Sequence, residues 1–227
     1  MMVWKPEWLL QLEMNQRGMR FLNYSEEQRE RRKKLFLAAN EFAERYEQHM
    51  MMKGIYIFGP TGVGKTHLLN AIANRLEERG IMAVVINVGR LIDWLSAASA
   101  QHSEMEKIIQ TLVSVPVLLL DEIGQEFANE WTIKKIYQLI NLRYTARLPV
   151  LYASNQAPPD LYKRLSGVCP EVVEPLVSRI AGTCRIGFLD GEDYRVEHSE
   201  FIDEDESNDN DTDLENNEKD ELKNIIH

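Results

Sequence analysis

The stretch Gly59-Pro60-Thr61-Gly62-Val63-Gly64-Lys65-Thr66 decides the fold class, because it matches the phosphate-binding pattern G-x-x-x-x-G-K-[ST]. It follows the apolar run Ile55–Phe58 and leads into a helical pattern, which is the context that phosphate binding by a loop requires. We expect positive φ at Gly62 and Gly64, so that the backbone amides approach an anionic ligand closely. The stretch therefore predicts a P-loop nucleotide-binding fold.

The residues of this loop have expected contacts with ATP and Mg²⁺. We expect the Lys65 ammonium to reach the β- and γ-phosphates, and the Thr66 hydroxyl to bind the magnesium ion. A glycine-rich turn without a ligand is the alternative, and the strand before the loop and the helix after it argue against that alternative. The residues expected to bind the nucleotide are Gly59, Pro60, Thr61, Gly62, Val63, Gly64, Lys65, Thr66 and His67.

A pair of carboxylates ends a second apolar strand. The stretch Val117-Leu118-Leu119-Leu120-Asp121-Glu122 predicts a buried strand with two acidic residues at its end. In a doubly wound sheet, the carboxyl end of such a strand lies beside the phosphate loop. We therefore expect Asp121 to help hold Mg²⁺, and Glu122 to orient and polarise the attacking water.

Three polar residues farther along the chain are candidates for the same site. Asn155 follows the apolar run 150–154, where its amide can hold the lytic water or touch the γ-phosphate; a turn-forming asparagine is the alternative. Arg179 is a candidate arginine finger that an adjacent subunit supplies, and an exposed helix arginine is the alternative. Arg195 is a candidate for contact with the nucleotide of its own subunit, with a plain surface residue as the alternative.

The middle of the chain predicts an α/β fold. Nearly continuous apolar composition favours strands that are buried on both faces, as in a parallel sheet. Helical stretches, such as residues 65–79 and 130–147, lie between these strands, and the alternation implies a three-layer α/β sandwich. The five predicted strands cover residues 55–58, 82–88, 115–120, 150–154 and 184–189.

Composition divides the chain into three regions. Residues 1–50 look helical, residues 51–196 form the predicted ATPase domain, and residues 197–227 form an acidic tail that we expect to be disordered. The tail contains 13 acidic and two basic residues, whereas the preceding 196 residues contain 24 basic and 23 acidic ones. The net charge of −10 therefore comes from the tail, and it does not exclude nucleic acid as a partner of the remaining chain.

The first region contains helix signals. Ser25-Glu26-Glu27-Gln28 fits a capping box and predicts a helix that runs to about His49. The basic cluster at residues 29–34 is interpreted either as a solvated face or as a phosphate-contacting patch. An apolar stripe at residues 4–12 precedes this helix. The apolar residues predicted to share one face of the helix are Leu35, Ala39, Phe42 and Tyr46.

Other patterns concern the compartment and metals. No apolar run reaches the roughly 18 residues that a membrane span needs. The N-terminal sequence also lacks the uninterrupted apolar stretch of a signal peptide, so we expect a cytoplasmic protein. Cys169 and Cys184 show no metal-ligand spacing, which predicts two buried, reduced thiols.

Taken together, these motifs resemble the AAA+ ATPases, and among them the bacterial replicative-helicase loaders of the DnaC and DnaI type, which share an IstB-like ATP-binding core. The resemblance covers residues 50–196 and lies in GPTGVGKTHLLNAIANRL, VLLLDEIG, IYQLINLRY, YASN, LVSRI and FLDGEDYR. It implies a Walker A motif at residues 59–66, a Walker B motif at Asp121 and Glu122, sensor 1 at Asn155, an arginine finger at Arg179 and sensor 2 at Arg195.

The resemblance also implies partners. Such loaders form ATP-dependent homo-oligomers, bind single-stranded DNA and deliver a hexameric DnaB-type helicase to the replication fork, with the N-terminal segment gripping the helicase. They lack a C-terminal helical lid domain, which fits a chain that turns acidic after Arg195. The first 50 residues differ from the DnaI branch because they contain no cysteine for a zinc site.

Two other functions are compatible with the same motifs. An IstB-type transposition helper ATPase shares this ATP-binding core and is the main alternative. A regulator that binds nucleotide without hydrolysing it is a further alternative, and the presence of Glu122, Asn155 and Arg179 argues against it.

Overall fold

A five-stranded parallel sheet forms the centre of the computed structural model, which describes residues 16–24, 26–47, 50–125 and 129–191. The strand order is β2-β3-β4-β1-β5, and each neighbouring pair is parallel, as the sequence predicts. The capping box at Ser25, the apolar stripe at residues 4–12, Arg195 and the acidic tail fall wholly or partly outside the described residues. The strands are β1 (Gly54–Phe58), β2 (Ala83–Asn87), β3 (Val117–Asp121), β4 (Val150–Ser154) and β5 (Cys184–Phe188).

Local chemistry sets strand limits that differ slightly from the predicted ones. β3 begins at Val117 and not at residue 115, because Pro116 has no amide hydrogen to donate to a neighbouring strand. β2 ends at Asn87, one residue earlier than predicted, because the Asn87 side chain caps the following helix by accepting a hydrogen bond from the Arg90 amide.

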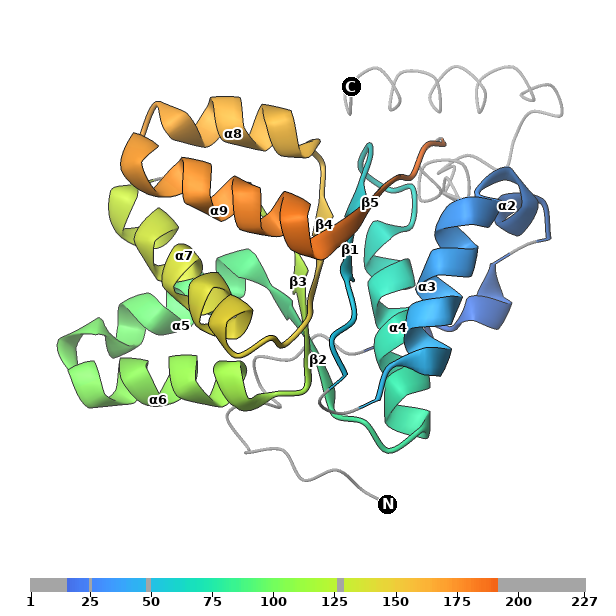
Figure 1. Ribbon diagram of the computed structural model, residues 1–227, viewed down its shortest axis with the longest axis horizontal. Helices are drawn as coiled ribbons and strands as arrows, with labels where there is room; N and C mark the ends of the chain where they lie inside the picture. Colours follow the sequence, from blue (N-terminus) through green and yellow to red (C-terminus); the bar gives the residue numbers. More distant parts are fainter. Residues whose placement is uncertain (1–15, 25, 48–49, 126–128, 192–227) are drawn as a thin grey trace, which may run out of the picture.

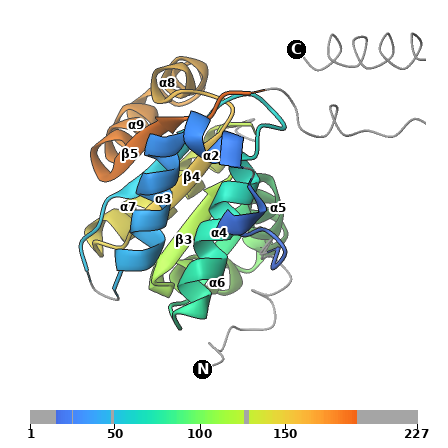
Figure 2. The ribbon, with the colours of Figure 1, turned by 90° about the vertical axis from the view of Figure 1, so that its right-hand side faces the viewer.

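Helices cover both faces of the sheet (Figures 1 and 2). α3 and α4 lie on one face, and α5 to α9 lie on the other, so the three-layer sandwich is confirmed. No helix within the described ranges is long and apolar enough to span a membrane. The helical elements are η1 (Phe21–Asn23), α2 (Glu26–Arg31), α3 (Lys33–Arg45), α4 (Lys65–Glu78), α5 (Val88–Ala97), η2 (Ala98–Ala100), α6 (His102–Ser114), α7 (Glu130–Thr145), α8 (Pro158–Ser166) and α9 (Pro170–Thr183).

Alternate residues of each central strand pack on opposite helical layers, as the pleat of a strand requires. In β3, for example, Leu118 and Leu120 contact the α5–α9 layer, whereas Leu119 contacts the α3–α4 layer. β5 is the exception to the expectation of burial on both faces, because it lies at the edge of the sheet and leaves Ile186 and Phe188 about half exposed.

The predicted N-terminal helix is two helices in the structure. α2 and α3 are separated at Arg32, and α3 ends at Arg45, short of the predicted end at His49. The predicted apolar face of α3 is confirmed, and it packs on α4 and on the sheet. Its members Leu35, Ala39, Phe42 and Tyr46 are all buried.

Candidate nucleotide-binding site

A cleft of about 610 Å³ lies at the carboxyl edge of the sheet, where the loop after β1 meets the ends of β3 and β4. The strand order reverses beside β1, and such a switch point is where parallel α/β sheets bind ligands. The volume lies within the usual range for small-molecule sites. The walls are residues 61–67, Asp121, Glu122, Asn155 and part of the N-terminal segment.

The phosphate loop has the backbone conformation that the sequence predicts. Gly62 has φ 76° and Gly64 has φ 98°, a left-handed region that residues with a side chain rarely occupy. Gly64 is also the N-cap of α4, so the first amides of this helix are directed toward the cleft. The loop therefore presents a helix N-terminus and backbone amides to the cleft, which together favour an anionic ligand.

Lys65 is the buried cation of the loop, with 9% of its surface exposed. Its ammonium donates to the carbonyl of Gly59 at 2.8 Å and to the carbonyl of Pro60. Gly59 and Pro60 thus hold Lys65 through their carbonyl oxygens and are not part of the cleft wall, whereas the other predicted loop residues are.

Thr66 and Asp121 form the candidate magnesium site. The Thr66 hydroxyl donates to Oδ2 of Asp121 at 2.8 Å, which joins the start of α4 to the end of β3. Burial raises the pKa of Asp121, and the charge of Glu122 adds to this effect. A hydroxyl and two carboxylates are the hard oxygen donors that Mg²⁺ prefers, and a cation here would relieve the repulsion between the carboxylates.

Glu122 is held by Asn87, a residue that is not among the predicted site residues. Its Oε2 accepts a hydrogen bond of 2.5 Å from Nδ2 of Asn87, at the end of β2. Glu122 also has φ 59°, a strained conformation for a residue with a side chain. Asn87 is a polar residue that ends a buried strand, like Asp121, so the pattern that identified Asp121 would also have identified it.

The remaining predicted site residues divide into two groups. Asn155 lines the cleft, and its Nδ2 donates to the Thr61 hydroxyl at 3.3 Å. His67 also lines the cleft, and its Nε2 lies 3.0 Å from the carbonyl of Arg20. Arg179 lies away from the cleft, on α9. The cleft wall thus contains all the predicted site residues except Gly59, Pro60, Arg179 and Arg195, of which the last lies outside the described part of the chain.

Residues 16–24, here called the N-terminal strap, form one wall of the cleft. Asn74 of α4 donates from Nδ2 to the carbonyls of Gln16, at 3.0 Å, and Met19, at 2.7 Å. The Tyr24 hydroxyl donates to the carbonyl of Gly64 at 2.7 Å, and its ring packs on His67 with the ring centroids 4.3 Å apart. No motif in the sequence predicts that residues before the first strand reach the phosphate loop.

Arg32 connects the phosphate loop to the end of the sheet. Its side chain is only 7% exposed, and it donates to the carbonyl of Val63, at 3.4 Å, and to the carbonyl of Asp190. Of the basic cluster at residues 29–34, this member is therefore neither a solvated side chain nor one directed at the cleft. Its hydrogen bond to Val63 holds the backbone of the phosphate loop, although Arg32 itself does not line the cleft.

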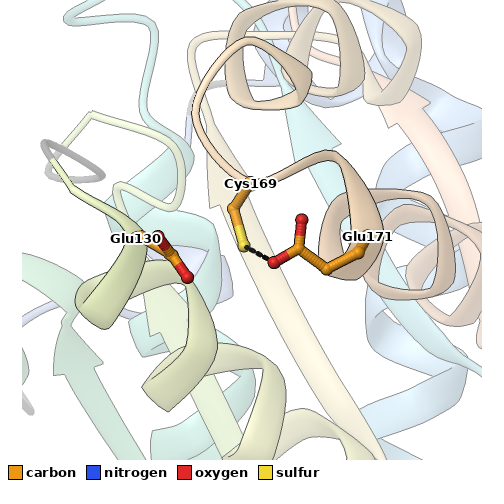
Figure 3. Close-up of side chains that lie close together, drawn as sticks. All are labelled: Glu130, Cys169 and Glu171. Atoms are coloured by element: carbon orange, nitrogen blue, oxygen red, sulfur yellow. Dashed lines mark hydrogen bonds between the residues drawn. The ribbon is translucent and has the colours of Figure 1, made fainter.

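Both cysteines are buried and free, as predicted. Cys169 lies near two glutamates, Glu130 and Glu171, and its thiol donates to Glu171 at 3.3 Å (Figure 3). Burial and this hydrogen bond raise the pKa of the thiol, so it keeps its proton and is a poor metal ligand. The ammonium of Lys134 pairs with both glutamates, so a side-chain cation already occupies this cluster.

Comparison with known proteins relates this geometry to ATP-binding families. The family model of IstB-like ATP-binding proteins matches residues 10–201. The replicative helicase loader DnaI of Bacillus subtilis is 31% identical over 128 residues, which are 56% of this chain and 41% of DnaI. The insertion sequence IS21 ATP-binding protein of Pseudomonas aeruginosa is 33% identical over 120 residues, 53% of this chain and 42% of that protein. The matches thus span less than half of these two relatives.

Solved structures agree on the fold. A crystal structure of DnaI matches with a TM-score of 0.63 and 27% identity, covering 84% of this chain and 94% of that one. A crystal structure of the DnaC helicase loader matches with a TM-score of 0.65 and 23% identity, covering 76% and 97%. The architecture is therefore that of a P-loop AAA+ protein.

Proposed function

Since the chain belongs to the family of IstB-like ATP-binding proteins, we propose that it is an ATPase that delivers a hexameric DnaB-type replicative helicase to single-stranded DNA. The ATPase part of this proposal depends on one observation. Lys65, the Thr66–Asp121 pair and Glu122 meet at a single cleft. The loading part depends on relatives that are themselves helicase loaders, DnaI and DnaC.

The proposed chemistry follows from the contacts in the cleft. When ATP binds, the Lys65 ammonium exchanges the carbonyls of Gly59 and Pro60 for phosphate oxygens. Thr66 and Asp121 would hold Mg²⁺, which neutralises charge on the phosphates. Because the backbone of the loop is already folded around the cleft, little backbone reorganisation opposes binding.

Glu122 and Asn155 act on the water. The Glu122 carboxylate accepts a proton of the attacking water, and the Asn87 amide keeps that carboxylate at the edge of the cleft. Asn155 follows β4, which lies between β3 and β1, and its amide contacts Thr61 of the loop, where it can donate to the γ-phosphate or to the water. A neighbouring copy supplies Arg179 in an ATP-dependent oligomer, since Arg179 does not line the cleft of its own subunit.

Glu122→Gln is expected to leave ATP binding intact and to lower turnover by about 10²-fold, because an amide cannot accept the proton of water. Glutamine keeps the size of the side chain and an oxygen for the Asn87 hydrogen bond. Nucleotide binding and phosphate release, measured on one preparation, check this result. Glu104→Gln, on the exposed face of α6, is the control and should match the unaltered chain. Equal turnover in both variants would contradict the assigned role.

An IstB-type transposition helper is the second candidate function, because the IS21 relative is as similar to this chain as DnaI is. The two candidates differ in their partners. A helicase loader binds a hexameric helicase and single-stranded DNA, whereas a transposition helper binds a transposase and duplex DNA.

A binding assay with ATP and Mg²⁺ separates these candidates. We expect the full chain to retain the replicative helicase of the same organism on a column, and its ATPase rate to change when single-stranded DNA is added. The Glu122→Gln variant prolongs the ATP-bound state and should retain more helicase. Retention of a transposase and duplex DNA, with no helicase, would favour the transposition function and refute the loading function.

A further inference from the structure

The guanidinium of Arg179 lies between two tyrosine rings of α7. Its Cζ atom is 5.1 Å from the ring centroid of Tyr137 and 5.4 Å from that of Tyr144. The two tyrosines are seven residues apart, which is two helical turns and about 10 Å along the axis. Both rings therefore belong to the side of α7 that packs on α9, and the cation occupies the space between them.

Hydrogen bonds fix Arg179 only weakly. Nη1 donates to the carbonyl of Pro175, one turn earlier in α9, at 2.9 Å. Nε is buried without a hydrogen-bond partner, and Nη2 donates no hydrogen bond to any residue of the described ranges. The ring contacts are therefore the main constraint on the plane of the guanidinium. Two N–H groups on Nη2 remain available for an anionic ligand.

Tyr144 is 51% exposed and Tyr137 is partly buried, so the ring of Tyr144 brings this cluster to the surface of the molecule. A free arginine side chain samples many rotamers, and a site that needs it must order it. An aromatic ring restrains the cation through its face without using the N–H groups at the edge. This arrangement therefore orders the side chain and leaves donors for a phosphate.

We propose that Tyr137 and Tyr144 are positioning residues that hold Arg179 ready for the ATP bound to a neighbouring copy. This inference rests on the proposed role of Arg179 as a finger supplied between subunits. Neither tyrosine contacts ATP in this proposal. Each acts through the guanidinium, by holding it in the orientation that the transition state requires.

The alternative is that the tyrosines only pack α7 against α9. Leucine substitutions distinguish the two roles, because leucine retains apolar packing but has no aromatic face. Phenylalanine retains the face and loses only the hydroxyl. A positioning role therefore predicts that Tyr→Phe variants behave like the unaltered chain and that Tyr→Leu variants do not.

The expected result for the double variant Tyr137→Leu/Tyr144→Leu is a kcat about tenfold lower, the order of one or two lost cation–π contacts, with unchanged KM for ATP. KM is unchanged because the cleft of the same subunit is intact. The corresponding double phenylalanine variant should keep kcat. If the double leucine variant does not fold, Tyr144→Leu alone is measured, since the exposed Tyr144 is the less critical to packing.

A mixing experiment tests whether the effect acts between copies. The double leucine variant has an intact cleft, and Lys65→Ala has intact tyrosines but a defective cleft. We expect a mixture to regain part of the lost turnover, because a Lys65→Ala copy can present its ordered Arg179 to the cleft of the leucine variant. A defect that reached the cleft of the leucine variant itself would not be repaired in this way.

Measuring Arg179→Ala in parallel shows whether a negative result refutes the role of Arg179 as a finger or only the positioning role of the tyrosines. If Arg179→Ala keeps full turnover, the finger is wrongly assigned and the positioning role is refuted with it. If Arg179→Ala loses turnover while the leucine variants keep theirs, the finger stands and only the positioning role is refuted. The positioning role would also be refuted if the leucine and phenylalanine variants lost kcat equally, or if mixing with Lys65→Ala restored no turnover.

Discussion

Replacing Arg179 by alanine is expected to leave ATP affinity nearly unchanged and to lower turnover by about 10³-fold, the lower end of what arginine fingers contribute. The reason is geometric. Arg179 does not line the cleft of its own subunit, so its loss removes no contact with the ground-state nucleotide there. It removes a cation that reaches the γ-phosphate only in an assembled oligomer. Equilibrium binding of a fluorescent ATP analogue and steady-state phosphate release measure the two quantities.

Mixing Arg179→Ala with Lys65→Ala gives the sharpest version of this test. Neither variant alone is expected to hydrolyse ATP, because one lacks the finger and the other lacks the phosphate-binding ammonium of a working cleft. The mixed oligomer contains interfaces at which an intact cleft meets an intact Arg179, so turnover should partly return.

The control is Arg45→Ala, which removes an exposed arginine of α3 whose guanidinium pairs with Glu41 at the surface. It should change neither binding nor turnover. A mixture that stays inactive while both variants still assemble would contradict a contact between subunits, and would assign Arg179 to its own copy.

The sequence predicted most of the cleft because its chemistry lies at the ends of strands. Asp121 and Asn155 each follow an apolar run that can only be a buried strand, and parallel strands end at the same edge. The phosphate loop is local, and its glycines imply its backbone conformation without knowledge of the rest of the chain. Such features need no information about long-range packing.

Contacts between segments that are distant in the sequence could not be predicted from local patterns. The hydrogen bond from Tyr24 to Gly64 joins residues 40 positions apart, and no periodicity in the sequence marks it. The position of Arg32 behind the phosphate loop depends on the break between α2 and α3, which the helical pattern did not predict. Side-chain packing, not local propensity, decides features of this kind.

Arg143 is the clearest case in which the residue type does not predict burial, because an arginine in a helix ordinarily lies at the surface. Here the side chain is fully buried. Nη1 donates to the carbonyls of Leu112 and Val115, both at 2.7 Å, and Nη2 donates to that of Pro149 at 2.7 Å. Burial lowers the pKa of Arg143 to about 10, so the group is still a cation at neutral pH.

The Arg143 guanidinium donates hydrogen bonds that these buried carbonyls would otherwise lack. The Leu112 carbonyl is in the last turn of α6, where its helical partner four residues later is Pro116, which has no amide hydrogen. The guanidinium thus satisfies acceptors at the end of α6, before β3 and before β4, and it fixes the ends of these elements relative to one another.

Arg143→Met is therefore expected to lower the free energy of unfolding by about 3–5 kcal/mol, because it leaves several buried carbonyls without a donor. Removing the charge saves the cost of its burial, but the lost hydrogen bonds outweigh this gain because each orphaned acceptor costs about 1–3 kcal/mol. For a chain of this length the corresponding fall in the midpoint of thermal unfolding is about 10 °C.

Urea and thermal denaturation, followed by circular dichroism, check this expectation. Arg143→Lys keeps the charge but loses the planar guanidinium. Its free energy of unfolding should lie between that of Arg143→Met and that of the unaltered chain. It also provides a measurement if the methionine variant does not fold. Arg45→Met, on the surface, should differ from the unaltered chain by less than about 0.5 kcal/mol. If Arg143→Met and Arg45→Met proved equally stable, the carbonyls would have found other donors, and the guanidinium would not be what joins α6, β3 and β4.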